Sequence, residues 1–391
     1  MEEQLPHTIS HVIFLIFSGT AVLSTLALFT RQSLLVAYIV LGAILGPWGL
    51  KLVSNGIVIK QAGDIGIIFL LFLLGLHLQP QNLFHSLRKM SLITVSSSLL
   101  FFIVGFVVSF TFGYTYEESL VIGIAAMFSS TIIGLKLLPT TILHHQHTGE
   151  LVISILLLQD IIAIGAILIM QMIAGKGGLY EVGLFISAFP VLLLVAYFFQ
   201  RFILSWLLAR FDKIHEYIFI LSIGWCLCMA ELSHSFGLSE EIGAFIAGVS
   251  LASNPISFYI AESLKPLRDF FLVLFFFSIG AGFNFGYFGQ VIIPACILAG
   301  FILILKPMVF NWLLYRSGEI KSVSWEIGVR LGQMSEFSLL IIYMALETSL
   351  MSQQTAYMAE AAIIITFIIS CYWTVIRYPT PLASTDRLRR D

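Results

Sequence analysis

The stretch SILLLQDIIAIG, residues 154–165, places an amide and a carboxylate, Gln159 and Asp160, in the middle of an apolar run. At a helical rise of about 1.5 Å per residue, Asp160 lies roughly 15 Å from the nearer end of the apolar segment 150–174. An ionised carboxylate at that depth in a bilayer costs about 2.5 kcal/mol or more unless a partner or water compensates it. Two interpretations follow: a site for a cation and a proton, which we favour, or a protonated Asp160 in a structural interhelical hydrogen bond.

The composition of the whole chain indicates a membrane protein. Of its 391 residues 59% are hydrophobic and 11% are charged, against about 25% charged residues in soluble domains. The net charge is −2, and we find no basic stripe that would indicate nucleic-acid binding. Apolar runs recur throughout and predict an all-α polytopic membrane protein in a lipid bilayer. We count thirteen segments, at about 9–29, 33–50, 62–78, 91–113, 118–139, 150–174, 182–209, 215–235, 240–253, 267–285, 290–315, 323–348 and 355–378.

Basic residues predict the orientation of these segments. With the N-terminus outside, the loop cations on the outer side are Lys51, Lys60 and Lys176, and most other Lys and Arg residues fall on the cytoplasmic side. The positive-inside rule therefore places the N-terminus outside and the C-terminus in the cytoplasm. If one helix had been missed, the loops after it would be assigned to the wrong side and the basic residues would be mixed between the two sides. The clear asymmetry therefore also favours an odd number of helices.

Internal similarity predicts a duplication. Gly75 in FLLFLLGLHLQPQNLF (69–84) and Gly280 in FFFSIGAGFNFGYF (275–288) are 205 residues apart, as are Gly123 and Gly328. The period spans seven helices, an odd number, so the two copies have opposite orientations in the membrane. We expect a single transmembrane domain over 1–391, with repeat 1 at about 9–174, a linker helix at about 182–209 and repeat 2 at about 215–378. Inverted repeats of this kind are an architecture of secondary transporters.

Small polar residues lie in corresponding places in the two repeats, in FSSTIIG (128–134) and GQMSEFS (332–338). Hydroxyl groups often bond back to their own helix backbone. In register in both repeats, they instead predict two helices broken at mid-membrane, whose free ends face an ion. Glu336 has two interpretations, as an ion ligand or as a structural partner of Arg330 or of the helix ends. The candidate ligands beside Asp160 and Gln159 are Ser129, Ser130, Thr131, Ser335 and Glu336, with Gln333 next to them.

Other titratable residues carry alternatives. Lys306, in ILILKPMVFNW (302–312), needs a carboxylate or the C-terminal end of a half-helix, and acts either as a structural counter-ion or in proton coupling. His77 is a snorkelling interfacial residue or a pH sensor. We expect a solvated loop, without a metal site, at His144, His145 and His147. The sequence contains no nucleotide-binding loop, nucleophile elbow or zinc-ligand spacing, so we expect a transporter and no enzyme, and no cofactor.

Several stretches together resemble a known family. They are LGAILGPWGLKLV (41–53), FLLFLLGLHLQP (69–80), FSSTIIG (128–134), LLLQDIIAI (156–164), EEIGAFIAGVSLA (240–252), LKPLRDFFLVLFFFSIGAGFNFG (264–286) and LGQMSEFSLL (331–340). The chain resembles the membrane domain of Kef-type potassium/proton antiporters, in the monovalent cation:proton antiporter-2 branch of the cation:proton antiporter superfamily. The Gln159–Asp160 pair is the specific part of the likeness, because sodium/proton relatives typically carry Asp-Asp or Asn-Asp there.

The resemblance implies a sodium/proton-antiporter-like fold with thirteen helices and two crossed, broken helices. It also implies a homodimer, elevator-like movement of a core domain, and alternate binding of a cation and a proton at Asp160. Two residues depart from the family pattern: His77 stands where members often have an acidic residue, and Arg330 where a small or apolar residue is usual. Kef proteins also carry a cytosolic nucleotide-binding regulatory domain, whereas this sequence stops at RLRRD (387–391). The resemblance leaves open a regulatory domain or subunit outside this chain.

The resulting hypothesis is K⁺/H⁺ exchange by an integral protein of the bacterial inner membrane. A protonated Asp160 is neutral and crosses with its domain, whereas an ionised Asp160 crosses only with a cation. The alternatives are an Na⁺/H⁺ antiporter of the same fold, a non-transporting membrane scaffold or sensor, and a passive channel.

Overall fold

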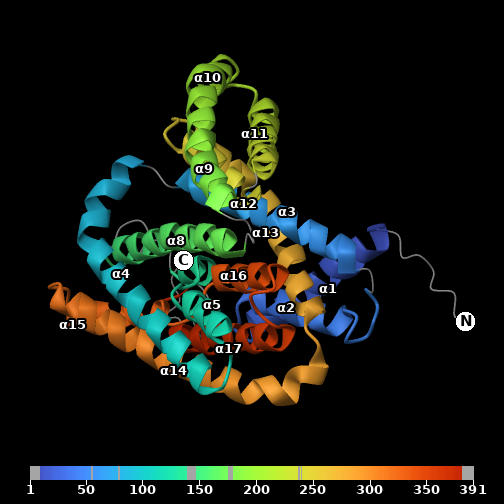
Figure 1. Cartoon of the computed structure of the whole chain (residues 1–391), viewed down its shortest axis with the longest axis vertical. Helices are drawn as coiled ribbons and strands as arrows, with labels where there is room; N and C mark the ends of the chain where they lie inside the picture. Colours follow the sequence, from blue (N-terminus) through green and yellow to red (C-terminus); the bar gives the residue numbers. More distant parts are fainter. Residues whose placement is uncertain are drawn as a thin grey trace, which may run out of the picture. The chain divides into compact units, whose positions relative to one another are not determined.

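The computed structural model describes residues 9–53, 56–77, 80–138, 147–174, 179–236, 238 and 240–380 (Figure 1). Its helices confirm the predicted all-α membrane fold, and the two segments expected to contain broken helices are both interrupted. The helices are α1 (Ile9–Phe29), α2 (Leu34–Leu45), α3 (Gly56–His77), α4 (Pro80–Thr111), α5 (Tyr116–Ala126), α6 (Thr131–Lys136), α8 (His147–Ala174), α9 (Leu179–Phe199), η1 (Gln200–Leu204), α10 (Ser205–Arg210), α11 (His215–Ser235), α12 (Glu240–Ala252), α13 (Ser257–Gly282), η2 (Phe285–Tyr287), α14 (Phe288–Arg316), α15 (Lys321–Arg330), α16 (Glu336–Glu347) and α17 (Gln353–Arg377).

Seven helices in the described part of the chain are long and apolar enough to cross a bilayer. Shorter apolar helices lie at Leu34–Leu45, Gly63–Leu73 and Ile242–Ala252. The chain is therefore an integral membrane protein, while the count of thirteen crossings stays a prediction. The same holds for the direction in which the helices cross.

Contacts divide the chain into two compact units, and each unit takes segments from both halves of the sequence. The first unit comprises Met1–Thr20, Tyr38–Phe84 and Leu168–Gly282. Its hydrophobic core includes Phe72 on α3, Trp225 on α11 and Ala247 on α12, all at most 5% exposed. In Figure 1, α9 and α10 run beside α11, and the ring of Phe199 stacks on Trp225 with the centroids 4.8 Å apart.

Glycine allows α3 and α12 to approach closely in this unit. A Cβ atom added at Gly248 would collide with the carbonyl oxygen of Phe72, and one at Gly75 with the carbonyl oxygen of Phe245. Small residues let membrane helices approach to backbone contact, which compensates for the weak hydrophobic drive between helices in lipid. Gly248, the last residue of GAFIAG (243–248), thus has a packing role here.

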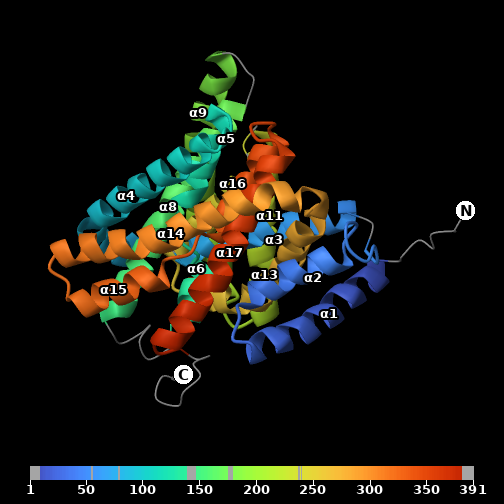
Figure 2. The ribbon, with the colours of Figure 1, turned by 90° about the horizontal axis from the view of Figure 1, so that it is seen from below.

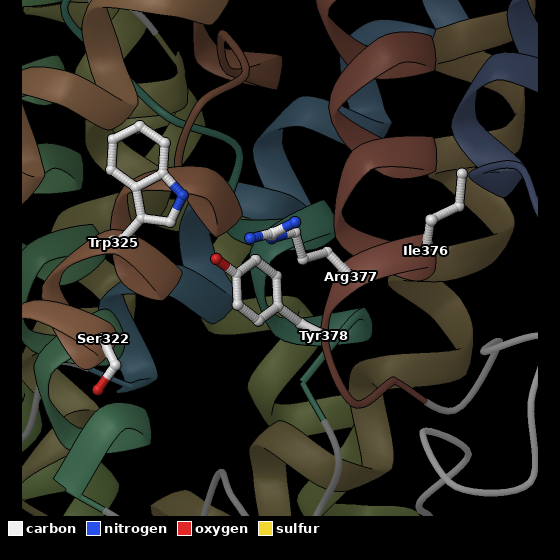
Figure 3. Close-up of a pocket in the computed structure, with 5 residues that line it drawn as sticks. All are labelled: Ser322, Trp325, Ile376, Arg377 and Tyr378. Carbon is white, nitrogen blue, oxygen red and sulfur yellow. The ribbon is translucent and has the colours of Figure 1, made fainter.

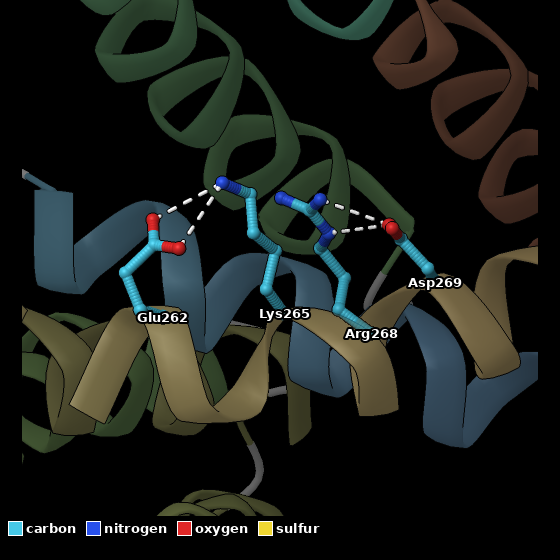
Figure 4. A network of polar contacts seen from close by, with 4 residues as sticks. All are labelled: Glu262, Lys265, Arg268 and Asp269. Atoms are coloured by element: carbon cyan, nitrogen blue, oxygen red, sulfur yellow. Dashed lines mark hydrogen bonds and ion pairs between the residues drawn. The ribbon is translucent and has the colours of Figure 1, made fainter. Parts of the chain in front are cut away.

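The N-terminal half of α13 is charged and begins ten residues before the apolar segment predicted at 267–285 (Figure 4). Lys265 Nζ lies 3.1 Å from Glu262 Oε1, and Arg268 Nη2 lies 2.9 Å from Asp269 Oδ1. Three of these four side chains are about half exposed, so each pair contributes roughly 1 kcal/mol or less. The helix extends past the apolar segment because Ile260, Ala261 and Leu264 on its other face are buried in the core of this unit, while the ion pairs lie on its more exposed face.

The second unit comprises Ala21–Ala37, His85–Ile167 and Phe283–Asp391. Here α14 contacts both α15 and α17, as Figure 2 shows for the long orange and red helices. Buried apolar side chains join α8 to its neighbours, among them Ile155 on α8, Phe101 on α4 and Phe310 on α14. This core fixes α8, which carries Gln159 and Asp160, beside both interrupted helices.

Candidate functional site

The first interruption separates α5 from α6. Helix α5 ends at Ala126, and α6 begins at Thr131. Ser130 Oγ accepts a hydrogen bond of 3.0 Å from the Ile133 backbone N–H, which caps the start of α6. Hydroxyl side chains satisfy free N–H groups at a helix start, so the serine cluster favours a new helix start over a continuous helix.

The second interruption separates α15 from α16. Helix α15 ends at Arg330, and Ser335 is the N-cap of α16. Ser335 Oγ accepts from the Phe337 N–H at 3.1 Å, and Ser338 Oγ accepts from the Ser335 N–H at 3.2 Å. Ser130 and Ser335, which are 205 residues apart, therefore both accept a hydrogen bond from a backbone N–H at the start of the helix that follows each interruption.

The two interruptions bond directly to each other. Ser129 Oγ donates to the carbonyl oxygen of Leu331 at 2.8 Å, and Ser338 Oγ donates to the carbonyl oxygen of Ala125. Each broken helix thus supplies a hydroxyl donor to the C-terminal carbonyls of the other. Such carbonyls lack partners in their own helix and would be costly to leave unpaired in a membrane interior.

Lys306 on α14 completes this junction. Its side chain has no exposed surface, and its Nζ donates to the carbonyl oxygens of Phe128 and of Gln333, the latter at 3.0 Å, and to Ser129 Oγ at 3.3 Å. Among the described residues no carboxylate lies within ion-pair distance of Lys306. Of the two kinds of partner considered for this lysine, it therefore has the free carbonyls of the interrupted helices, where a positive charge is favourable.

Asp160 lies on α8 and is 1% exposed. Thr131 Oγ1, from the first residue of α6, donates to both of its carboxylate oxygens, at 3.2 and 3.3 Å. The carboxylate therefore meets the N-terminal end of a half-helix, where negative charge is favourable.

Gln159 contacts the backbone of the first interruption. Its Oε1 accepts from the Ser129 N–H at 3.0 Å, and its Nε2 donates to the Met127 carbonyl oxygen at 3.2 Å. Both ends of the amide are thus in use within the protein. The side chain holds the interruption open next to Asp160, and Oε1 retains a second lone pair.

Glu336 is 2% exposed and stands in the first turn of α16. It lies within electrostatic range of Asp160. Arg330 pairs elsewhere, with Glu326 Oε1 at 2.8 Å. Glu326 stands one helical turn before Arg330 on the same helix and is its carboxylate partner. The position of Glu336, at a half-helix start near Asp160, favours a role as an ion ligand or as a structural partner of the helix ends.

Helix α17 supplies two site residues that the sequence did not single out. Ser370 Oγ donates to Gln333 Oε1 at 2.7 Å, and Thr366 Oγ1 accepts from the Met334 N–H at 3.1 Å. Both are buried and fix the second interruption from behind. Their spacing of four residues on one helix face, in an apolar segment, was the available signal.

Arg330 bonds to backbone carbonyl groups just beyond the C-terminal ends of α6 and α17. Its Nη1 donates to the Leu137 carbonyl oxygen at 3.0 Å, and its Nη2 donates to the Pro379 carbonyl oxygen at 2.9 Å. Its guanidinium carbon lies 5.6 Å from the ring centroid of Tyr378. Tyr378 lines a cavity of about 530 Å³ with Ser322, Trp325, Ile376 and Arg377, drawn in Figure 3.

The histidines have separate outcomes. The side chain of His77 and all of His144 and His145 lie outside the described residues. His147 begins α8, and its Nε2 lies 2.9 Å from Glu319 Oε2. The prediction of a solvated loop is therefore wrong for His147, because α8 begins three residues before the apolar segment predicted at 150–174.

Comparison with known proteins agrees with this geometry. The family model described as "Sodium/hydrogen exchanger, transmembrane" matches residues 13–376. The chain is 27% identical to K(+) efflux antiporter 6 of Arabidopsis thaliana, over 80% of its own length and 53% of that protein. It is also 27% identical to the glutathione-regulated potassium-efflux system protein KefC of Salmonella arizonae, over 97% of its own length and 63% of that protein. The chain thus spans less than two thirds of these curated relatives.

Solved structures show the same fold. The sodium proton antiporter MjNhaP1 from Methanocaldococcus jannaschii at pH 8 superimposes with a TM-score of 0.70 at 16% identity, covering 93% of this chain and 95% of that one. A second structure of MjNhaP1, an electron-microscopy map, gives a TM-score of 0.64 at 17% identity, covering 95% of this chain and 94% of that one.

Proposed function

This chain is a member of the sodium/hydrogen exchanger family, and from that premise we propose that it exchanges a monovalent cation, K⁺, for H⁺ across a membrane. The observation that carries the proposal is the setting of Asp160: a buried carboxylate, bonded by Thr131, at the start of a half-helix inside an integral membrane protein. A carboxylate there needs a proton or a cation, since a bare charge in a low-dielectric interior is costly.

Exchange follows from competition between the two ions for Asp160. With a proton bound, the site is neutral and changes the side of the membrane that it faces. With a cation bound, it is again neutral enough to do so, whereas the empty, ionised site is held back by the cost of the charge. The hydroxyl of Thr131 and the carboxylate of Glu336 supply further oxygen atoms, which suit monovalent cations. Serines 129, 130 and 335 support the site indirectly, by holding the two interruptions.

One cation for one proton would make the exchange electroneutral. Lys306 has backbone carbonyls and one hydroxyl as its partners, and this favours a structural role for its charge over proton release. We further propose that the chain forms homodimers through its first unit, and that the two halves of the sequence are inverted repeats. We also propose that the protein lies in a bacterial inner membrane, with its N-terminus outside and its C-terminus in the cytoplasm.

K⁺ is favoured over Na⁺ because curated relatives across much of this chain are named for potassium efflux. It is also favoured because the residue next to Asp160 in the sequence is an amide, Gln159, and not a second carboxylate. An Na⁺/H⁺ antiporter is the second candidate, favoured by the structural likeness to a sodium proton antiporter. A regulatory nucleotide-binding domain or subunit fits the greater length of the relatives. A non-transporting scaffold or sensor is the alternative that a measured ion flux would exclude.

The test is reconstitution into liposomes that contain a pH-sensitive dye, with addition of K⁺ or Na⁺. We expect a K⁺-driven change of internal pH, weaker with Na⁺ and lost in Asp160→Asn. The matched control is Asp269→Asn, which removes an exposed carboxylate from α13 and should leave exchange intact. A stronger Na⁺ response would overturn the K⁺ assignment, and exchange that survives in Asp160→Asn would overturn the role of Asp160. No flux with either ion would favour the scaffold.

A further inference from the structure

A second polar cavity lies wholly within the first unit. It has a volume of about 500 Å³ and opens between the α9–η1–α10 segment and the end of α12. One wall carries Gln200, Arg201 and Ser205, and the other carries Ser250, Ser253 and Asn254. No acidic side chain is among the described residues that line it, and Arg201 contributes a positive charge to the cavity. The remaining lining residues are Leu193, Ala196, Tyr197, Ile246, Val249 and Pro255.

Arg201 is an anomaly in its surroundings. It is exposed, and within the described part of the chain it has no ion pair or hydrogen bond. It belongs to the apolar span Ala188–Arg210 and lies roughly 13 Å from its end at about 1.5 Å per residue. Phe198, Phe202 and Trp206 around it are 53–69% exposed and form an exposed aromatic surface within an apolar span. An arginine on such a surface requires an anion or a path to the interface.

The backbone turn at Arg201 is specialised. Residues Gln200–Leu204 form a π-helix, the wide turn that occurs often at functional sites. The extra residue per turn brings Gln200 Nε2 to Ser205 Oγ at 3.0 Å, five positions along the chain. Both of these side chains line the cavity on either side of Arg201 in the sequence, so the π-turn gathers three polar side chains at one wall.

The opposite wall is rigid and offers neutral polar groups. Trp225 Nε1 donates to Ser250 Oγ at 3.1 Å and to the Ala247 carbonyl oxygen at 3.3 Å, which fixes the end of α12. Asn254 Oδ1 accepts from the Ile256 N–H at 3.1 Å, so its amide NH₂ group is left as a donor. The exposed Ser253 adds a hydroxyl.

We propose that this cavity binds the phosphate headgroup of an anionic phospholipid. Arginine pairs well with phosphate, and the amide and hydroxyl groups around Arg201 complete a set of donors. The aromatic surface of α9 offers a track for the acyl chains, and basic cavities between membrane helices are typical sites for acidic lipid headgroups. The proposal is independent of ion exchange at Asp160.

The test uses the full chain, purified in detergent and stripped of lipid, with bound lipid measured by native mass spectrometry. We titrate phosphatidylglycerol and phosphatidylcholine with identical acyl chains. The expected result is one tightly bound phosphatidylglycerol per chain and at least about tenfold weaker binding of phosphatidylcholine, in line with a charge-assisted hydrogen-bonded pair. Arg201→Gln should remove most of that preference, and added salt should weaken it.

Two controls separate the cavity from general effects. Arg210→Gln removes a basic residue from the same segment that does not line the cavity, and should leave the preference unchanged. Ser253→Trp narrows the cavity while keeping Arg201, and should weaken phosphatidylglycerol binding. Glycerol phosphate and inorganic phosphate, which lack acyl chains, should bind at least about a hundredfold more weakly, because they bury no apolar surface against the aromatic face of α9.

Equal binding of the two lipids, or a preference that Arg201→Gln leaves intact, would overturn the proposal. Inorganic phosphate that binds as tightly as the lipid would show an anion site with no lipid specificity. A loss of dimers in Arg201→Gln, with lipid binding unchanged, would show instead that a second copy of the chain covers this face.

Discussion

Ser129 Oγ donates a hydrogen bond of 2.8 Å to the carbonyl oxygen of Leu331, although the two residues are 202 positions apart in the sequence. Leu331 is the C-cap of α15, and Ser129 lies in the interruption between α5 and α6. The reverse bond runs from Ser338 to Ala125. Two helices that would each be unstable when broken in a membrane therefore satisfy each other's free backbone groups.

The first prediction concerns this mutual bonding. Ser129→Ala leaves the Leu331 carbonyl oxygen without its hydroxyl donor, and we expect a loss of about 1–3 kcal/mol in the free energy of unfolding. The measurement is chemical unfolding in detergent. The control is Ser324→Ala, which removes the hydroxyl of a similarly buried residue that bonds to the carbonyl oxygen of Ile320, the N-cap residue of its own helix. Equal losses in the two variants would contradict a special role for Ser129.

The second prediction concerns the hydroxyl on Asp160. Thr131→Val keeps the shape of the side chain and removes the donor to both carboxylate oxygens. Hydrogen bonds to charged groups contribute about 1.5–3 kcal/mol, so we expect the half-maximal cation concentration for exchange to rise by about tenfold or more. Thr131→Ser restores the donor and should restore the apparent affinity. Exchange kinetics in liposomes at fixed pH measure this. An unchanged affinity in Thr131→Val would exclude Thr131 from the site.

The third prediction concerns Lys306. Lys306→Met leaves the carbonyl oxygens of Phe128 and Gln333 without their donor, at about 1–3 kcal/mol each. We expect a lower midpoint of unfolding in detergent, and a smaller loss in Lys306→Gln, whose amide keeps one donor group. Removing the exposed Lys321 by Lys321→Met should have little effect.

Lys306 also allows a test of electroneutrality. If Lys306 retains its proton throughout the cycle, ion exchange by the wild-type protein in liposomes should generate no membrane potential. A membrane potential that Lys306→Gln abolishes would instead assign Lys306 to proton coupling.

The fourth prediction concerns Arg330, which bonds to the carbonyl oxygens of Leu137 and Pro379 and pairs with Glu326. Arg330→Met removes all three contacts and leaves two carbonyls and a half-buried carboxylate without this partner. Removing one partner from a buried charged pair costs about 3–5 kcal/mol, so we expect a large fall in unfolding free energy. Arg316→Met removes an exposed arginine on Trp312 and should cost far less. Similar losses of unfolding free energy in Arg330→Met and Arg316→Met would contradict the stabilising role of the Arg330 contacts.

The sequence by itself determined the membrane class, most of the helical segments and the two places where helices break. Apolar runs of bilayer length permit little besides helices, because every backbone polar group in lipid needs an internal partner. Ser129 to Thr131 and Gln333 to Glu336 marked the interruptions, because hydroxyl and amide groups in mid-helix compete for the backbone. Asp160 was singled out by the cost of its charge alone.

Tertiary structure alone decided which groups these residues contact. Lys306 donates to backbone carbonyl groups, Arg330 donates to the carbonyl oxygens of Leu137 and Pro379, and both ends of the Gln159 amide contact the backbone of the first interruption. Thr366 and Ser370 on α17 contact the second interruption, although nothing in the sequence distinguished their hydroxyl groups from others in apolar segments. Composition and spacing report how costly a buried polar group is, but its partner depends on which free helix ends the fold brings within hydrogen-bonding distance. Gln159 and Ser129 are 30 positions apart and Lys306 and Phe128 are 178 positions apart, so packing determines these partners.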